Sequence, residues 1–187
     1  MKTSMKALTL VLCAVLLVCA SVMGTLAYLK AETEVVKNTF TVGKVEIDLD
    51  EAKVDEYGVE VEGASRVKAN EYKLIPGHTY AKDPMITVKT GSEDCWVFAK
   101  LEDGLADAST IVINEGWTQI RTTDGSVVYA YNTKLSAGMT ATLFNEFTFG
   151  DYDPAIYEQA AINITGYAVQ ADGFGTAQAA WDATFGA

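Results

Sequence analysis

The sequence predicts an all-β fold, an antiparallel jelly-roll β-sandwich with a short C-terminal helix. In several segments apolar and polar residues alternate with a period of two, as in strands that have one buried and one solvated face. About eight such segments follow one another at short intervals with no helical pattern between them, which is typical of sandwiches and jelly rolls. Turn-forming residues separate them, and Asp124-Gly125 is a strong hairpin signal.

The first clear strand is expected at residues 44–50. Its apolar residues alternate with charged ones and are Val45, Ile47 and Leu49. The two preceding apolar residues, Phe40 and Val42, have the opposite phase, and Gly43 lies where the phase changes. A shift of one residue otherwise turns an apolar face toward solvent, so Gly43 predicts a bulge or a sharp bend.

Eight later segments are also expected to be strands. In chain order they are 57–61, 66–74, 85–89, 95–101, 117–122, 126–131, 139–149 and 162–170. The clearest is 139–149, where apolar residues occupy one face apart from an irregularity at Phe144-Asn145. Segment 95–101 is apolar on both faces, which predicts either a central strand or contact with another surface. Residues 176–184 are rich in alanine and predict the helix, with Trp181 on its apolar face.

Residues 1–27 have the pattern of a cleaved secretory signal peptide. Two lysines in the first six residues precede an uncharged apolar run at 7–23, and small residues, Thr25 and Ala27, lie at −3 and −1 of a cut before Tyr28. The expected signal-peptidase cleavage is therefore between Ala27 and Tyr28. The alternative is a retained membrane anchor, since the run is close to the lower limit of about 17 residues for spanning a bilayer.

Cleavage would leave an extended N-terminal segment, residues 28–43, and one β-sandwich domain, residues 44–187. Cys13 and Cys19 lie in the leader, where neither follows the small residue that lipoprotein processing requires. Cys95 is then the only cysteine, so no internal disulfide is expected. Because Cys95 opens an apolar run, we expect its thiol to be buried.

The chain is acidic, with a formal net charge of −11. The leader carries two lysines and no acidic residue, so its removal brings the charge to −13. Nucleic acid and anionic membrane surfaces would repel such a protein, and we expect neither as a partner after cleavage. Acidic clusters such as residues 48–56 lack a calcium-loop pattern and are expected to be solvated faces, so no cofactor or metal is expected.

Several stretches resemble the TasA–camelysin family, secreted proteins of Gram-positive bacteria. The N-terminal stretches that carry the resemblance are Gly-Thr-Leu-Ala-Tyr-Leu at 24–29 and Asn-Thr-Phe-Thr-Val-Gly-Lys-Val-Glu-Ile-Asp-Leu at 38–49. The later ones are Leu-Ile-Pro-Gly-His at 74–78 with Lys-Asp-Pro at 82–84, Gly-Ser-Glu-Asp-Cys-Trp-Val at 91–97, and Tyr-Ala-Val-Gln-Ala-Asp-Gly-Phe at 167–174.

The resemblance implies a jelly-roll subunit of extracellular biofilm-matrix fibres that a SipW-type signal peptidase processes during export. It also implies a homo-oligomer or fibre in the matrix or at the cell surface, in which the segment freed by cleavage completes the sheet of the next subunit. The candidate donor strand is Tyr28–Val42, with Phe40 and Val42 as side chains that fill pockets. Head-to-tail pairing of this kind propagates as a filament. The alternative is that these residues form an ordinary first strand of their own subunit.

Two other functions compete with a structural role. Camelysin-like proteins are often labelled metalloendopeptidases, but His78 is the only histidine, and a zinc protease commonly needs H-E-x-x-H on a helix. We therefore expect no enzyme and no catalytic residues. A carbohydrate-binding module would need an aromatic platform, for which Trp96, Trp117, Tyr129 and Tyr131 are candidates. These aromatics lie within strand patterns, so core packing is the preferred interpretation.

Overall fold

The computed structural model describes residues 5–6, 11–17, 43–123 and 125–186. The chain divides into two units, Met1–Thr41 and Val42–Ala187. The described residues of the first unit are helical, and among the described residues no helix has the length and apolar character needed to cross a membrane. The predicted cleavage site, Ala27-Tyr28, and the predicted anchors Phe40 and Val42 lie outside the described residues.

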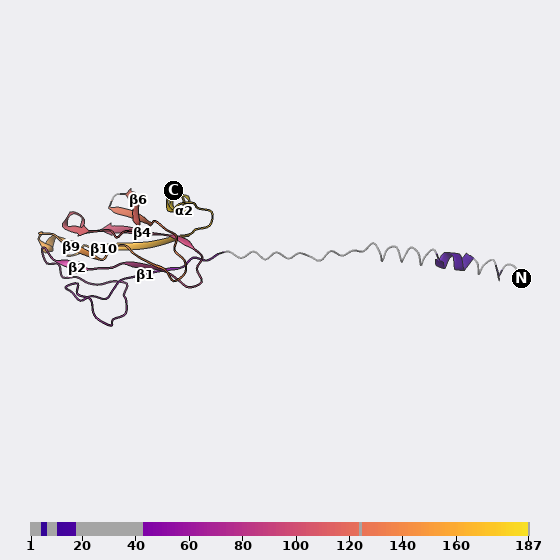
Figure 1. The fold of residues 1–187 in the computed structure, drawn as a ribbon, viewed down its shortest axis with the longest axis horizontal. Helices are drawn as coiled ribbons and strands as arrows, with labels where there is room; N and C mark the ends of the chain where they lie inside the picture. Colours follow the sequence, from indigo (N-terminus) through magenta and orange to yellow (C-terminus); the bar gives the residue numbers. More distant parts are fainter. Residues whose placement is uncertain (1–4, 7–10, 18–42, 124, 187) are drawn as a thin grey trace. The chain divides into compact units, whose positions relative to one another are not determined.

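The second unit is a sandwich of two antiparallel layers with a helix after the last strand (Figure 1). One layer is a four-stranded sheet, in the order β10 (Ile162–Gln170), β4 (Cys95–Asp103), β7 (Ser126–Tyr131) and β6 (Trp117–Thr123). The predicted fold class, an all-β antiparallel jelly-roll sandwich with a short C-terminal helix, is confirmed.

The other layer consists of two three-stranded sheets. The first has the order β1 (Ile47–Asp50), β3 (Met85–Val88) and β8 (Thr140–Thr142), and the second has the order β2 (Thr79–Ala81), β9 (Glu146–Phe149) and β5 (Ser109–Ile111). These two sheets follow one another within the layer, because the chain passes from β2 to β3 and from β8 to β9 after short interruptions. The chain crosses repeatedly between the layers, so that most strands adjacent in a sheet are distant in sequence, the β6–β7 hairpin excepted.

Strand β4 explains why segment 95–101 is apolar on both faces. It is central, between β10 and β7, and its residues Val97 and Ala99 pack in the core between the layers. Its opposite face carries Trp96 and Phe98, which the helix α2 (Ala177–Phe185) covers. Strand β4 is therefore both a central strand and in contact with a further surface, the two explanations that its apolar pattern allowed.

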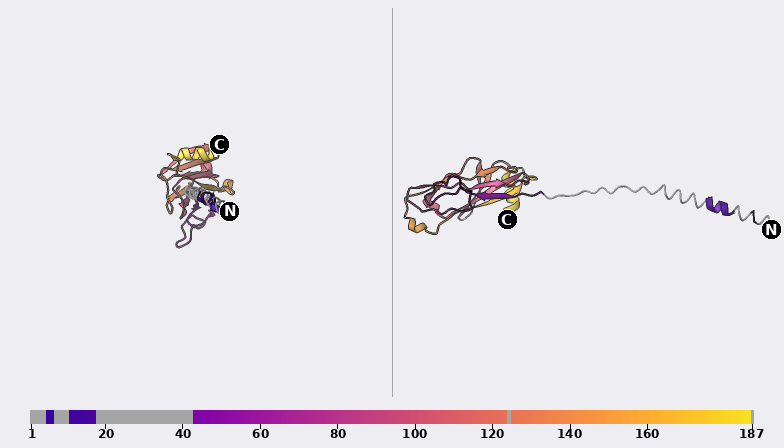
Figure 2. Two further views of the ribbon diagram at one scale, coloured as in Figure 1. Left: turned by 90° about the vertical axis from the view of Figure 1, so that its right-hand side faces the viewer. Right: turned by 90° about the horizontal axis from the view of Figure 1, so that it is seen from below.

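Helix α2 begins at an N-cap, Thr176, whose hydroxyl accepts a hydrogen bond from the Ala179 N–H at 3.2 Å. Its buried residues, Ala180 and Trp181, place its apolar side on the sheet. The right-hand view of Figure 2 shows α2 at the end of the sandwich opposite the connection that precedes β10. Two short 3₁₀ helices, η1 (Ala106–Ala108) and η2 (Pro154–Tyr157), lie in the remaining connections.

Three strand predictions were wrong in detail. Segments 57–61 and 66–74 form only isolated bridges, Val54 to Glu60 and Glu51 to Val67, within a long irregular excursion between β1 and β2. Segment 139–149 is not one strand but two, β8 and β9. The interruption lets the consecutive residues Leu143 and Phe144 both be buried, which a regular strand could not do.

Cys95 is fully buried, as predicted, and its Sγ lies 3.6 Å from the carbonyl oxygen of Leu135. Burial, with a smaller contribution from the charge of Asp94, raises the pKa of this thiol to about 11. The thiolate is therefore scarce at neutral pH.

We expect Cys95 to resist a thiol reagent such as Ellman's reagent at pH 8 in the folded protein. In a chain with Cys13→Ala and Cys19→Ala, the reaction should be at least about a hundredfold slower than in urea, because both the thiolate fraction and access are reduced. The measurement is the absorbance change on labelling, with and without urea. Rapid labelling without unfolding would contradict this burial.

Candidate functional site

The outer edge of β10 is the first part of the candidate site. Gly104 N–H donates to the Ala161 carbonyl and Ala171 N–H donates to the Asp94 carbonyl, which fixes the odd-numbered residues of β10 as those that bond to β4. In an antiparallel pair the intervening residues direct their N–H and C=O groups away from the partner. The even-numbered residues of β10, from Ile162 to Gln170, therefore direct their backbone groups outward. Their side chains Ile162 and Ile164 pack toward the core.

Among the described residues, no hydrogen bond is made to these outward groups of β10. The other edge strands, β1, β2, β5, β6 and β8, are short, distorted or closed, and β2 and β8 have only three residues each. Strand β5 has only three residues, and β6 has an irregular register between Gln119 and Arg121. The edge of β1 is closed near its end, because the Leu49 carbonyl accepts from Lys68 Nζ at 2.6 Å. Short strands, bulges and charges are the usual protection of sheet edges, and β10, with nine residues, lacks them.

An apolar groove of about 980 Å³ lies beside the first residues of β10. Its apolar lining comes from several elements and includes Leu74, Leu105, Phe147, Tyr157, Ile162 and Ile164. It also borders the end of β1 and the connection that contains η2. An extended segment pairing with the outward groups of β10 could therefore place alternate side chains in this groove.

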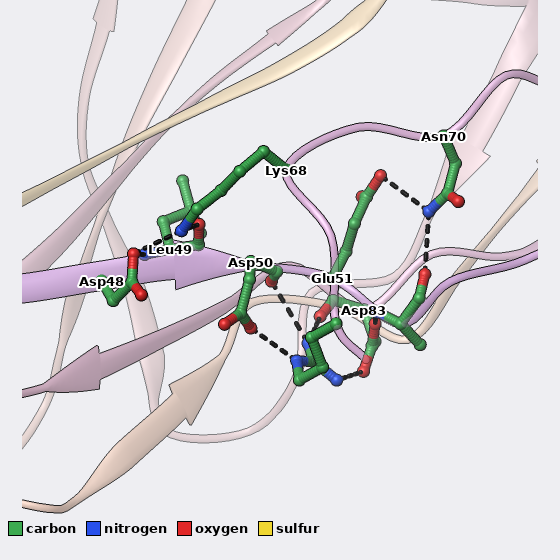
Figure 3. A network of polar contacts seen from close by, with 9 residues as sticks. Asp48, Leu49, Asp50, Glu51, Lys68, Asn70 and Asp83 are labelled. Carbon is green, nitrogen blue, oxygen red and sulfur yellow. Dashed lines mark hydrogen bonds and ion pairs between the residues drawn. The ribbon is translucent and has the colours of Figure 1, made fainter. Parts of the chain in front are cut away.

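One wall of the groove is residues 68–74, which a polar network holds in place (Figure 3). Asn70 is the central residue of this wall. Its amide nitrogen donates to Glu51 Oε1 at 3.0 Å and to the Ala52 carbonyl at 2.8 Å, while its amide oxygen accepts from the Val54 N–H at 3.0 Å. All three bonds tie the wall to the chain just after β1.

A buried ion pair lies at the same place. Glu51 Oε2 and Lys82 Nζ are 2.5 Å apart, and their side chains are only 6% and 10% exposed. Tyr72 is next to this pair in the wall and donates its hydroxyl to the Ala81 carbonyl at 3.1 Å. Burial, together with the charge of Glu51, raises the pKa of Tyr72, so the hydroxyl stays protonated and remains a donor.

Arg66 forms the second ion-pair cluster of the network. Its guanidinium bonds to Asp50 Oδ1 at 2.5 Å and to Asp83 Oδ2 at 2.7 Å, joining the end of β1 to the start of β3. Partial burial opposes its charge, but the hydrogen bonds that the guanidinium donates to Asp83 and Asp50 outweigh this effect and raise the pKa of Arg66. The guanidinium of Arg66 therefore remains charged at any physiological pH.

The sequence candidates for other chemistry lie apart from this groove. His78 Nε2 is 2.9 Å from the Tyr57 carbonyl oxygen, and its ring packs edge-on against Tyr80. Within the described ranges, no group of three or more His, Cys, Asp or Glu residues could hold a metal ion.

The four candidate platform aromatics do not form one exposed surface. Trp96 packs under α2, whereas Trp117 is buried in the core between the layers, with Tyr129 and Tyr131 packed against that core. Core packing, the preferred interpretation, is confirmed.

Sequence reasoning predicted β10 as a strand but not as the open edge, and it missed the groove entirely. The groove depends on the irregular excursion between β1 and β2, whose only sequence signals were two false strand patterns. The residues that fix it, Arg66, Asn70 and Lys82, have no local motif. No known protein family, curated protein or solved structure matches the chain, so the functional argument rests on this geometry and on the sequence.

We expect Glu51→Ala to lower the free energy of unfolding by about 3–5 kcal/mol, because it leaves the Lys82 ammonium buried without its partner. Asp48→Ala is the matched control. It removes an ion pair with Lys68 whose side chains are 45% and 65% exposed, and should lower the free energy of unfolding far less, because solvent screens an exposed pair. Urea denaturation measures both, and equal losses would show that the buried pair does not fix the wall.

Proposed function

We propose that the protein is a secreted structural subunit of extracellular biofilm-matrix fibres, assembled by β-strand donation between copies. The observation that supports this proposal best is the open edge of β10 beside an apolar groove. The resemblance of the leader and of residues 38–49 to the TasA–camelysin family supports the same class of protein. The role is non-catalytic and requires no cofactor.

Strand donation suits this edge for two physical reasons. An added strand satisfies the outward N–H and C=O groups of β10, and its alternate side chains enter the groove. The candidate donor is Tyr28–Val42, whose residues Phe40 and Val42 share one face of an extended strand. Burial of each of these two side chains is worth about 1.5–3 kcal/mol, in addition to the main-chain bonds.

Export precedes assembly in this proposal. The leader directs the chain out of the cell, a SipW-type signal peptidase removes residues 1–27, and the released protein acts in the matrix or at the cell surface. The cut creates a new N-terminus at Tyr28, the first residue of the candidate donor.

N-terminal sequencing of the secreted protein should find Tyr28 as the first residue. Ala27→Asp should block release, because the signal-peptidase pocket for the residue before the cut accepts only small uncharged side chains. Lys30→Asp, beyond the cut, is the control and should still be processed. A start more than two residues away, or secretion of the uncut chain, would contradict the predicted cleavage.

Phe40→Asp should abolish or strongly reduce filaments while changing the thermal midpoint of the subunit little, because in this proposal the Phe40 side chain packs on another copy and not on its own subunit. Thr41→Asp introduces the same charge on the opposite face of the strand and is the matched control.

A chain beginning at Lys44 should remain folded and monomeric. Electron microscopy and thermal melts measure these effects, and unfolding of the shortened chain would instead make residues 28–42 a core strand of their own subunit.

A further inference from the structure

The position at which the chain enters the sandwich determines the direction of a donated strand. Gly43 lies against the end of β10: a Cβ added to it would be 3.1 Å from the side-chain amide of Gln170 and 3.0 Å from Glu93 Cγ. The Lys44 carbonyl accepts from the Glu93 N–H at 2.9 Å. The chain therefore enters beside Gln170, and any larger residue at position 43 would require the side chains of Glu93 and Gln170 to shift.

The groove lies at the opposite end of β10. From Gly43 the chain runs along β1 in the direction opposite to β10, since a Cβ on Gly166 would be 3.3 Å from Ile47 Cδ1, and Leu49 lines the groove together with Ile164. Nine residues of strand span roughly 26–30 Å. Figure 1 agrees with this separation, with β2 and β9 toward one end of the sandwich and α2, which follows β10, toward the other.

The chain enters the sandwich at one end of β10 and the groove lies at the other end. The direction of an added strand therefore determines how copies assemble. Residues 28–42 run toward Gly43, so a segment that filled the groove of its own copy would lie parallel to β10. A parallel strand from another copy would place the sandwich of that donor copy next to the Gln170 end of the acceptor's β10. The ends at which the chain enters the two sandwiches would then face each other. Such an exchange is reciprocal and gives a closed dimer.

Only an antiparallel strand allows open head-to-tail growth. The sandwich of the donor copy then lies at the groove end of the acceptor. The groove of the donor copy is at its far end and remains free for the next copy. Antiparallel pairing also gives the slightly more stable ladder. In this arrangement Phe40 and Val42 are the donor residues nearest the donor's sandwich, and they lie at the groove beside the start of β10.

We propose that the partner of the β10 edge is residues 28–42 of a second copy of this chain, bound antiparallel to β10 with Phe40 and Val42 beside Ile162 and Ile164. This inference rests on the proposed function and adds the edge, the direction and the approximate register. On the opposite face of the added strand, Thr41 then lies beside Asn163, which is exposed in the free subunit.

Disulfide cross-linking between two populations tests the direction. Both carry Cys13→Ala and Cys19→Ala, which leaves Cys95 as a buried thiol. One population carries Asn163→Cys, and the other carries either Thr41→Cys or the matched Thr33→Cys, the position that a parallel strand would place beside Asn163. The populations are mixed, assembled and oxidised, and the cross-linked peptides are quantified by mass spectrometry.

We expect the Thr41→Cys mixture to give about tenfold more cross-linked peptide than the Thr33→Cys mixture, because a disulfide needs Cα atoms within about 7 Å. The reverse ratio would establish a parallel strand and overturn the inference. Filaments without either cross-link would assign donation to another edge, which also overturns it while leaving the proposed function intact. Absence of filaments in the protein without introduced cysteines would count against the proposed function itself.

Discussion

The outward N–H and C=O groups of β10 are the constraint that gives this sandwich its directionality. A sheet that does not close into a barrel must end in edge strands, and an exposed edge is a template for another chain. Here the other edges are short, distorted by a bulge, or closed by Lys68, whereas β10 has nine residues in regular register with β4, and none of the described residues bonds to its outward groups. An unprotected edge is a liability in a monomer and an advantage in a protein that must bind copies of itself.

The groove beside that edge exists because polar contacts, rather than apolar packing, hold its wall. Asn70 and the Glu51–Lys82 pair fix residues 68–74 at a distance from β10, and Arg66 joins β1 to β3 below them. A buried ion pair is costly to desolvate and is a poor source of net stability, but it demands one geometry. An apolar wall could collapse onto Ile162 and Ile164 and fill the space, whereas a wall fixed by directional bonds keeps the groove open.

The period-two patterns were sufficient to predict the fold class, because alternation is dictated locally wherever one face of a strand is buried. They predicted β1, β4, β7 and β10, and the expected hairpin joins β6 to β7, with Gly125 in its turn. They failed where distant residues decide the conformation. Residues 66–74 alternate like a strand but lie along the sandwich because Arg66 and Asn70 find partners at Asp83 and Glu51. The groove could not be predicted for the same reason, since its lining combines residues from 49 to 164 that no sequence spacing relates.

Charge and geometry act on different stages of the proposed assembly. After loss of the leader each copy carries a formal charge of −13, so copies repel one another at a distance, and salt weakens that repulsion over the Debye length of about 10 Å at 0.1 M. The candidate donor has two lysines and two glutamates and is neutral, so its docking adds no repulsion to the groove. Ionic strength then governs how often copies meet, while the β10 ladder and the apolar anchors, which act only at contact, govern how long they stay together. An acidic subunit can therefore remain dispersed during export and still form a stable filament at high local concentration.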